Sequence, residues 1–456
     1  MKLGWLLIVM PILCTAAADA ADGSKLLGAC SAAVTSKRIP AGMTGDGYIR
    51  FCQCLVAKAG DNQALVDEYV GITTAGPGEL EAKLAASSNT AKAVGAACQD
   101  RPFPPEPQIE LHVPFEPTAF PSVDRTYLTY ELILTNVSPT ALSIQRLEVL
   151  NAGSPDKQPI AAFEGARLDG VLQHFRNPTM GDTKPVVTSD YRQLDSGESA
   201  AMFLTLKLEH GAAVPGTVLH RLITSDAIVQ GAIVGTHHTQ LHLLGPPLLG
   251  AQWQVNAGPG NNDSYHRRGL LVVGGNGAIS RRYAIDWLKV VNGTTHAGDE
   301  RNNRSYFAYG EPILAVADGI VSNTKDGIPE NVPGHNGKGV RAVPLSVDTI
   351  SGNTIVLNIG GGQFAHYYHL QPGSLRVKAG DHVRIGQVLA QVGDSGDAFE
   401  PHLHFEVTTS SQTLTGEGVP YLINSYRILS APEVGGVWRR RELPLDSMLI
   451  DFGGKR

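Results

Sequence analysis

Two histidines lie two residues apart near the carboxyl end of the chain, in the segment EPHLHFEV from Glu400 to Val407. In a β-strand, side chains at this spacing leave the same face, so His402 and His404 would direct two imidazoles to one place. A neutral imidazole can bind a metal ion, and a histidine can also donate or accept a proton near pH 7. An H-x-H pair also occurs on solvated sheet faces, so the preceding sequence has to distinguish the two interpretations.

Three further motifs precede this pair. They are a G-x-P-[IV]-x-A-x-x-x-G-x-V segment from Gly310 to Val321, a Y-x-H-L segment from Tyr367 to Leu370, and the turn VKAGDHVRIGQVLAQVG. Together with the closing H-L-H-F, they closely resemble the lysostaphin/LytM-type zinc endopeptidases, which have the duplicated hybrid motif fold and cut peptidoglycan cross-bridges and stem peptides. The resemblance covers residues 252–407, about a third of the chain.

The resemblance implies a zinc ion that is held by two histidines and an aspartate, with one position left for water. Zinc lowers the pKa of such a water to about 7. Histidines beside it can move protons to or from that water and the leaving amine. Carried over residue by residue, the resemblance makes His404 a zinc ligand and makes His369 and His402 the two catalytic histidines.

The aspartate ligand of these enzymes comes from an earlier H-x-x-x-D motif, and the matching segment here reads RRYAIDW. Asp286 supplies the acid, but Arg282 occupies the histidine position. A guanidinium stays protonated and has no lone pair to give to zinc. Either the domain has lost its metal and serves as a binding or regulatory module, or another histidine supplies the missing ligand.

His266 is the candidate for the missing ligand. The stretch YHRRGLLVVGGNGAISRRYAIDW predicts two strands joined by a glycine-rich turn, centred on residues 275–277. With residue 276 as the midpoint, His266 faces Asp286 directly, with Cβ atoms ~5 Å apart, and a shift of one residue would break this pairing. We therefore predict His266, Asp286 and His404 as the zinc ligands; the alternative is that His266 is a surface strand residue.

Other polar residues of this region are weaker candidates. His366 lies an odd number of positions before His369 and would point to the opposite face of a strand, which favours a structural role. His296 and His335 lie in polar loops and are substitutes if the hairpin prediction fails. Asp318 matches a family position that serves a turn.

The elements that must position these residues are short strands with tight glycine turns, which predict an all-β peptidase domain over residues 252–430. Its insert at residues 322–353 is long for a connection between strands. Long loops on a rigid β scaffold often form the walls of binding grooves, so the insert is a hypothesis for substrate specificity.

Before this region, the segments YLTYELILTN and FLTLKLEH alternate apolar and polar residues with period two. Short strands separated by Asn, Pro, Gly and Ser predict an immunoglobulin-like β-sandwich at residues 107–247, which offers a surface for a protein partner. A proline-rich linker precedes it. Residues 21–101 have helical spacing, as in NQALVDEYVG, and predict a small helical module.

The amino terminus predicts a secretory signal peptide at residues 1–20, because Lys2 is followed by an apolar run and then by the small residues TAAADA. The run is shorter than the ~20 residues of a spanning helix, so no stable transmembrane anchor is expected. The mature chain would be periplasmic or extracellular.

Export favours disulfides among the four remaining cysteines, with three possible connectivities. A metal site at the CQC segment is the alternative. The four cysteines are Cys30, Cys52, Cys54 and Cys98.

Length and composition agree with a multidomain, mainly β protein. The chain has 456 residues, 42% of them hydrophobic, and a net charge of -6, which speaks against nucleic acid as a partner. The predicted function is that of an exported zinc metalloendopeptidase acting on peptidoglycan. The alternatives are an inactive domain that binds peptidoglycan or activates another cell-wall hydrolase, and a secreted adhesion protein.

Overall fold

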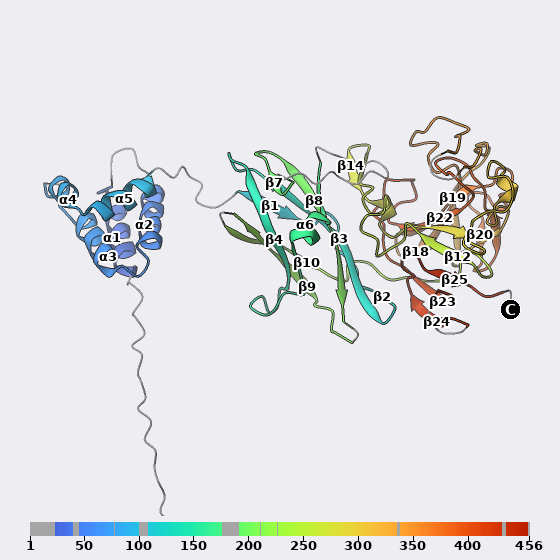
Figure 1. The fold of residues 1–456 in the computed structure, drawn as a ribbon, viewed down its shortest axis with the longest axis horizontal. Helices are drawn as coiled ribbons and strands as arrows, with labels where there is room; N and C mark the ends of the chain where they lie inside the picture. Colours follow the sequence, from blue (N-terminus) through green and yellow to red (C-terminus); the bar gives the residue numbers. More distant parts are fainter. Residues whose placement is uncertain are drawn as a thin grey trace, which may run out of the picture. The chain divides into compact units, whose positions relative to one another are not determined.

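The computed structural model in Figure 1 describes residues 23–39, 45–76, 78–99, 108–175, 191–209, 211–225, 227–334, 338–430 and 435–454. The chain divides into two compact units, Met1–Glu106 and Pro107–Arg456. The predicted signal peptide lies outside the described residues. Within the described parts, no helix is both long and apolar enough to cross a membrane.

The first unit is helical. Its helices in the described residues are α1 (Ser24–Thr35), α2 (Gly45–Ala59), α3 (Gln63–Thr73), α4 (Leu80–Ala86) and α5 (Asn89–Gln99). Helix α3 begins where the side chain of Asn62 accepts a hydrogen bond from the backbone N–H of Leu65, as N-cap residues do. Its apolar residues Leu65, Val66 and Tyr69 are buried in the core of this unit.

Two disulfides connect these helices. Cys30–Cys52 joins α1 to α2, and Cys54–Cys98 joins α2 to α5. The prediction of two disulfides is confirmed, and the structure selects one of the three connectivities.

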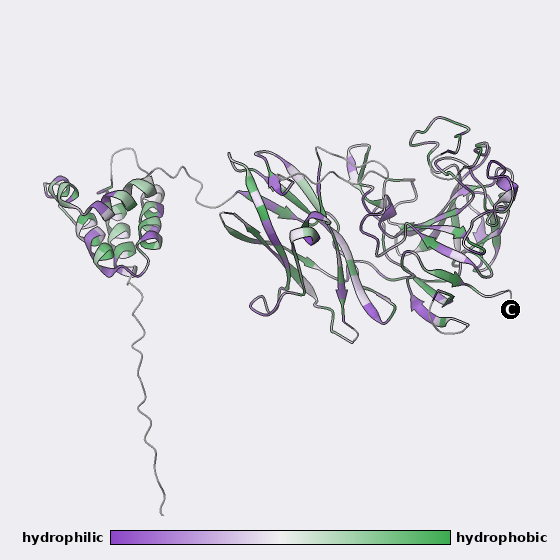
Figure 2. Cartoon of the chain, in the orientation of Figure 1, coloured by the Kyte–Doolittle hydropathy of each residue, from purple (hydrophilic) through white to green (hydrophobic). Residues whose placement is uncertain are grey.

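The second unit begins with two antiparallel sheets that share one core. The first sheet contains β1 (Ile109–His112), β2 (Phe120–Ser122), β3 (Arg125–Asn136), β6 (Leu172–His174) and β8 (Ser199–Leu208). The second contains β4 (Leu142–Asn151), β5 (Ala161–Glu164), β7 (Gln193–Leu194), β9 (Thr217–Thr224) and β10 (Ile228–Gly235), and the short helix α6 (Gly165–Asp169) follows β5. Figure 2 shows apolar and polar segments interleaved along these strands.

One face of β3 fills the core between the two sheets. Leu128, Tyr130, Leu132 and Leu134 are fully buried there, as the period-two pattern predicts. The opposite face of β3 is buried too, because it packs against the C-terminal part of the same unit. This second burial was not expected from the alternating pattern.

The C-terminal part is built on an eleven-stranded sheet. Its strands are β11 (Leu243–Leu244), β12 (Trp253–Asn256), β15 (Ile285–Lys289), β17 (Gly319–Lys325), β18 (Asn353–Gly360), β19 (Gln363–Leu370), β20 (His382–Val383), β22 (Leu403–Thr408), β23 (Leu422–Ile428), β24 (Val437–Glu442) and β25 (Leu449–Asp451). Two small ladders lie outside it, β13 (Leu271–Val273) with β14 (Asn276–Ala278) and β16 (Pro312–Leu314) with β21 (Val388–Gln391). Two short 3-10 helices, η1 (Ser280–Tyr283) and η2 (Asn303–Ser305), complete the described elements.

The hairpin predicted to bring residues 266 and 286 together does not have the expected register. Strands β13 and β14 pair Val273 with Asn276, so the turn is formed by Gly274 and Gly275. Both glycines have positive φ, 59° and 85°, and a two-residue turn of this kind requires positive φ at both central positions. Pairing ends at Ala278, and η1 follows. The prediction that His266 and Asp286 are strand partners is therefore wrong.

Candidate metal centre

Asp286 and His404 face each other in the middle of the large sheet. Strand β15 pairs with β22 so that these two residues are direct partners in the register. His404 Nδ1 lies 2.8 Å from Asp286 Oδ1, and both residues are less than 5% exposed, at 3% and 4%. A buried carboxylate and imidazole therefore meet at the second histidine of the H-L-H-F motif.

His266 reaches the same carboxylate from an irregular segment rather than from a strand. Its Nε2 lies 3.5 Å from Asp286 Oδ2, and its Nδ1–H donates to the carbonyl oxygen of Ala257 at 3.0 Å. Burial lowers the pKa of His266 to about 3, so the ring is neutral. With the proton on Nδ1, the lone pair of Nε2 points toward Asp286.

One ligand atom from each of these three residues lies within 4.8 Å of the other two. We call His266, Asp286 and His404 the ligand cluster. Burial by itself would raise the pKa of Asp286, but the neighbouring His266 and His402 hold it well below its ordinary value, so the carboxyl is ionised. Two imidazole nitrogens and one carboxylate oxygen are a donor set that suits zinc.

Two further side chains hold the ligand cluster in place. The hydroxyl of Tyr265 donates to Asp286 Oδ2. His404 Nε2 lies 3.3 Å from Glu406 Oε2, so the fully buried Glu406 accepts the Nε2–H and leaves Nδ1 directed toward Asp286. Carboxylates that orient a ligand histidine in this way are frequent at metal sites. A cation between Nδ1 and the carboxylate would replace the proton that His404 shares with Asp286 here.

His369 and His402 lie next to the ligand cluster, with ring centroids 4.8 Å apart. His369 Nδ1–H donates to the carbonyl oxygen of Ser395 at 2.7 Å, and His402 Nδ1–H donates to that of Glu400 at 2.8 Å. Each ring therefore has Nε2 available on its other side, and Nε2 of His402 lies 3.4 Å from Asp286 Oδ1.

The backbone of His369 is strained. It has a φ of 63°, in the left-handed region that residues with a Cβ seldom adopt. Backbone strain of this kind clusters at functional sites, where the surrounding structure holds it.

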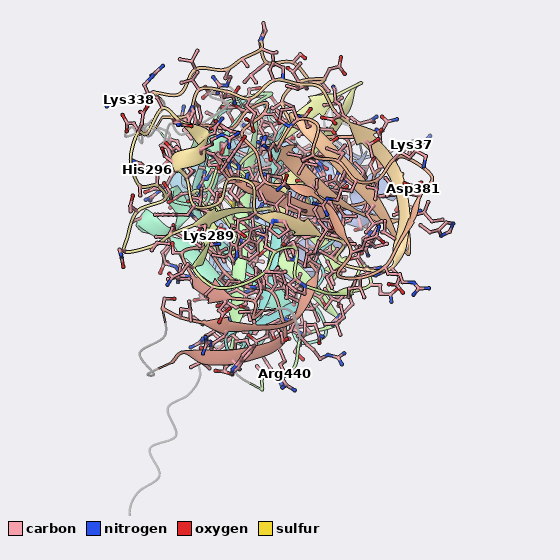
Figure 3. All side chains as sticks on the ribbon, turned by 90° about the vertical axis from the view of Figure 1, so that its right-hand side faces the viewer. Lys37, Lys289, His296, Lys338, Asp381 and Arg440 are labelled. Carbon is pink, nitrogen blue, oxygen red and sulfur yellow. A yellow bond between two sulfur atoms is a disulfide. The ribbon has the colours of Figure 1, made fainter. Side chains whose placement is uncertain are left out.

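The remaining sequence candidates have other surroundings. His366 is fully buried, and its ring bonds Thr408 and the carbonyl oxygen of Ser410, which is a structural arrangement. The ring of His296 lies 5.1 Å from that of Tyr306, and His296 lies near the edge of the view in Figure 3, outside the ligand cluster. His335 lies outside the described residues.

Arg282, at the family's histidine position, points away from the ligand cluster. Its Nη2 lies 2.7 Å from Oε2 of Glu131 on β3 and 2.6 Å from Oε2 of Glu417. Its Nη1 donates to the carbonyl oxygen of Gly418 at 2.9 Å. Arg282 is thus a structural residue between the sandwich and the C-terminal sheet.

The segment after His266 is fixed on the same surface. Arg267 donates to Glu131 and, at 2.7 Å, to the carbonyl oxygen of Tyr130. The guanidinium of Arg268 lies over the ring of Phe203 on β8. The sandwich therefore holds the segments on both sides of the glycine hairpin, one that carries His266 and one that leads to Asp286.

The ligand cluster opens onto a cavity of about 700 Å³. The insert at residues 322–353 contributes Arg341, Leu345, Val347 and Ile350 to its lining. This places the insert in the wall of the cavity, as expected of a long loop on a β scaffold.

The sequence did not identify Tyr265, Glu406 and Glu131 as residues of the site or its support. Of these, Glu406 could have been found, because it lies two positions after His404 on the same strand face.

A buried histidine and aspartate cluster in the floor of a cavity defines this part of the chain as a candidate metal-dependent hydrolase. Residues 305–415 match the peptidase family M23. Peptidases of this family use zinc and act on peptide or peptidoglycan substrates. His369, His402 and His404 lie inside the matched range, whereas His266 and Asp286 precede it.

Several solved structures are similar to parts of the chain. A variant catalytic domain of the prophage-encoded M23 protein EnpA from Enterococcus faecalis is 18% identical, and the match covers 38% of this chain and 92% of that one with a TM-score of 0.23. The catalytic domain of the antimicrobial peptidase lysostaphin from Staphylococcus simulans is 20% identical, with 37% and 88% covered and a TM-score of 0.21. A zinc-containing peptidase from Vibrio cholerae is 14% identical, with 64% and 79% covered and a TM-score of 0.22. None of the curated proteins matches the chain.

Proposed function

We propose that this protein is an exported zinc metalloendopeptidase that hydrolyses peptide bonds in peptidoglycan. The observation that carries the proposal is the convergence of His266, Asp286 and His404 on one point, with the Nε2 atoms of two more histidines beside it. Bound there, zinc would supply a water of lowered pKa and a Lewis acid for the peptide carbonyl.

The chain's own residues have separate roles in this proposal. His266 Nε2, the carboxylate of Asp286 and His404 Nδ1 would hold the metal, because their other polar atoms are already engaged by Ala257, Tyr265 and Glu406, respectively. This leaves one donor atom on each residue for the ion.

His369 and His402 would hold and move the protons. Their Nδ1 atoms are bound by backbone carbonyl oxygens, so only Nε2 can accept a proton from the attacking water or return it to the leaving nitrogen.

The other parts of the chain have supporting roles in the proposal. Residues 1–20 would direct export, and the two disulfides of the helical module agree with an oxidising compartment. The sandwich would be immunoglobulin-like and would hold the segment of His266, in addition to any protein partner. The alternative, an inactive binding domain, requires that the ligand cluster binds no metal. The three donors of His266, Asp286 and His404 support an active enzyme instead.

The test uses the mature chain, residues 21–456, and purified cell-wall sacculi. We expect release of soluble peptides that stops with a chelator and returns with zinc, and that stops in a His402→Ala variant although zinc is retained. A His296→Ala variant is the matched control, because this histidine lies outside the ligand cluster. Wild-type protein that binds sacculi and releases nothing would favour the inactive binding domain and reject the enzyme.

A further inference from the structure

Three arginines line the cavity in front of the ligand cluster, and two of them are already paired. Arg341 lies 2.5 Å from Asp397, and Arg268 lies 3.2 Å from Asp263. Arg281 is different. Its Nε is buried and has no hydrogen-bond partner, and its guanidinium forms no ion pair with any carboxylate of the described residues.

The conformation of η1 explains why Arg281 faces the cavity. The other three residues of this turn, Ser280, Arg282 and Tyr283, are buried. Arg282 is bound by Glu131, and the hydroxyl of Tyr283 donates to the carbonyl oxygen of Thr129 at 2.9 Å. Because the sandwich holds these neighbours, Arg281 is the one residue of η1 that contributes to the cavity wall.

The guanidinium of Arg281 packs against Gly269, which also lines the cavity. A Cβ atom added to Gly269 would lie 2.8 Å from the carbonyl oxygen of Tyr265 and 2.9 Å from Nη2 of Arg281. A larger residue at position 269 would therefore clash with both.

The Nε–H of Arg281 is buried without a partner, which is costly, whereas the side chain as a whole is half-buried and lines the cavity. A planar carboxylate would suit this position, because a guanidinium can donate two parallel hydrogen bonds, one of them from Nε, to the two oxygens of one carboxylate. The peptide substrate is the molecule that must enter this cavity if the proposed function holds.

We propose that Arg281 binds a carboxylate of the substrate, so that the enzyme selects peptides with a free carboxylate close to the bond that is cut. This inference rests on the proposed function of the same site. The carboxylate belongs either to the carboxyl terminus of the peptide or to an acidic side chain, and the two sources share the same chemistry.

The test compares three synthetic cross-linked stem peptides: one with all carboxylates free, one with the carboxyl terminus amidated, and one with the side-chain carboxylates amidated. We expect wild-type kcat/KM for the free peptide to exceed that for one of the two amides by roughly 10- to 100-fold, the range of a charge-assisted pair. The amide that loses activity identifies the source of the carboxylate.

The variants separate substrate binding from a structural role. Arg281→Met should reduce the preference for the free peptide over its amide to about twofold or less. Arg281→Lys should keep part of this preference, since lysine keeps the positive charge but cannot donate two parallel hydrogen bonds. Arg376→Met is the control, because that arginine is exposed and does not line the cavity, so its removal should not change the preference. Arg281→Met should also keep its zinc and its melting temperature.

Two results would overturn the inference. One is a preference for the free peptide that is the same in Arg281→Met as in the wild type. The other is a loss of kcat/KM in Arg281→Met that is equal for all three peptides. If the wild-type chain cleaves none of them, the proposed function has failed, and calorimetric binding of the same peptides decides this inference separately. Tighter binding of the free peptide by wild type than by Arg281→Met supports the carboxylate site. Equal binding rejects it.

Discussion

Glu131 on the β-sandwich and Arg282 on the C-terminal domain form a buried ion pair, with Oε2 and Nη2 2.7 Å apart and both side chains at most 2% exposed. The arginine occupies the position at which the family has a zinc-binding histidine. Its charge is used at the interface instead, where Glu131 also accepts a hydrogen bond from Arg267. Arg282 therefore stabilises the contact between the sandwich and the C-terminal sheet.

Removing Glu131 should strongly destabilise the second unit. In a Glu131→Gln variant, Arg282 would keep Glu417 as its ion-pair partner, whereas the buried Arg267 would lose its carboxylate and keep the carbonyl oxygens of Tyr130 and Leu204. Breaking a buried pair by removal of one partner costs about 3–5 kcal/mol. Denaturant unfolding at neutral pH measures the change. Glu209→Gln is the control, because its partner Arg125 and Glu209 itself are exposed, and such surface pairs contribute about 1 kcal/mol or less. Equal losses in the two variants would contradict the structural role of Glu131.

Restoring the family's histidine should not repair the site. The side chain of Arg282 points toward Glu131 and Glu417, not toward Asp286. A double variant, His266→Ala with Arg282→His, should therefore bind no more zinc than His266→Ala alone, as measured by metal analysis of the purified chains. Recovery of zinc binding in the double variant would mean that position 282 can still reach Asp286.

The two histidines beside the ligand cluster should affect the rate and not the metal content. Their Nε2 atoms are available for proton transfer, which contributes about 10²- to 10⁴-fold to such reactions. We expect His369→Ala and His402→Ala to reduce kcat by about this factor while zinc per chain stays at the wild-type value. Loss of zinc in either variant would mean that the substituted histidine is a metal ligand instead.

His220 should make the sandwich sensitive to acid. Its ring lies between the hydroxyl of Tyr130 and the carbonyl oxygen of Ala232, and burial lowers its pKa to about 4. Between about pH 6.5 and pH 4 the unfolded chain binds a proton at His220 that the folded chain does not, so stability falls as the pH falls.

The expected loss from this group is about 3 kcal/mol between pH 7 and pH 4. Denaturant unfolding of wild type and His220→Gln at both pH values, with a chelator present, isolates the contribution. The variant should lose less stability on acidification than the wild type. Identical pH dependence would exclude His220 as the titrating group.

The parts of the site that depend on local sequence could be predicted. His402, His404 and Asp286 lie in short motifs whose spacing determines the strand face. His266 was also predicted as a ligand, but on the basis of a hairpin register that the structure does not have. Its real contact with Asp286 depends on a two-residue glycine turn followed by η1, and the sequence GGNG allows more than one choice of central residues.

The interface could not be predicted because its partners lie far apart in the chain. Glu131 is separated from Arg282 by 151 residues. In β3 the residues Thr129, Glu131 and Ile133 occupy the positions that a period-two pattern assigns to solvent, and they are buried because a second layer covers them. Nothing in the local pattern of a half-polar strand indicates that such a layer is present.

The most direct test of the central claim is the zinc affinity of the mature chain and of its His266→Ala variant, measured by competition with a chromophoric chelator. The structure predicts about one zinc per wild-type chain and a loss of roughly 100-fold or more in affinity for the variant, because one of three protein ligands is removed. His296→Ala should bind zinc as the wild type does. Equal zinc affinity in wild type and His266→Ala would contradict the ligand cluster.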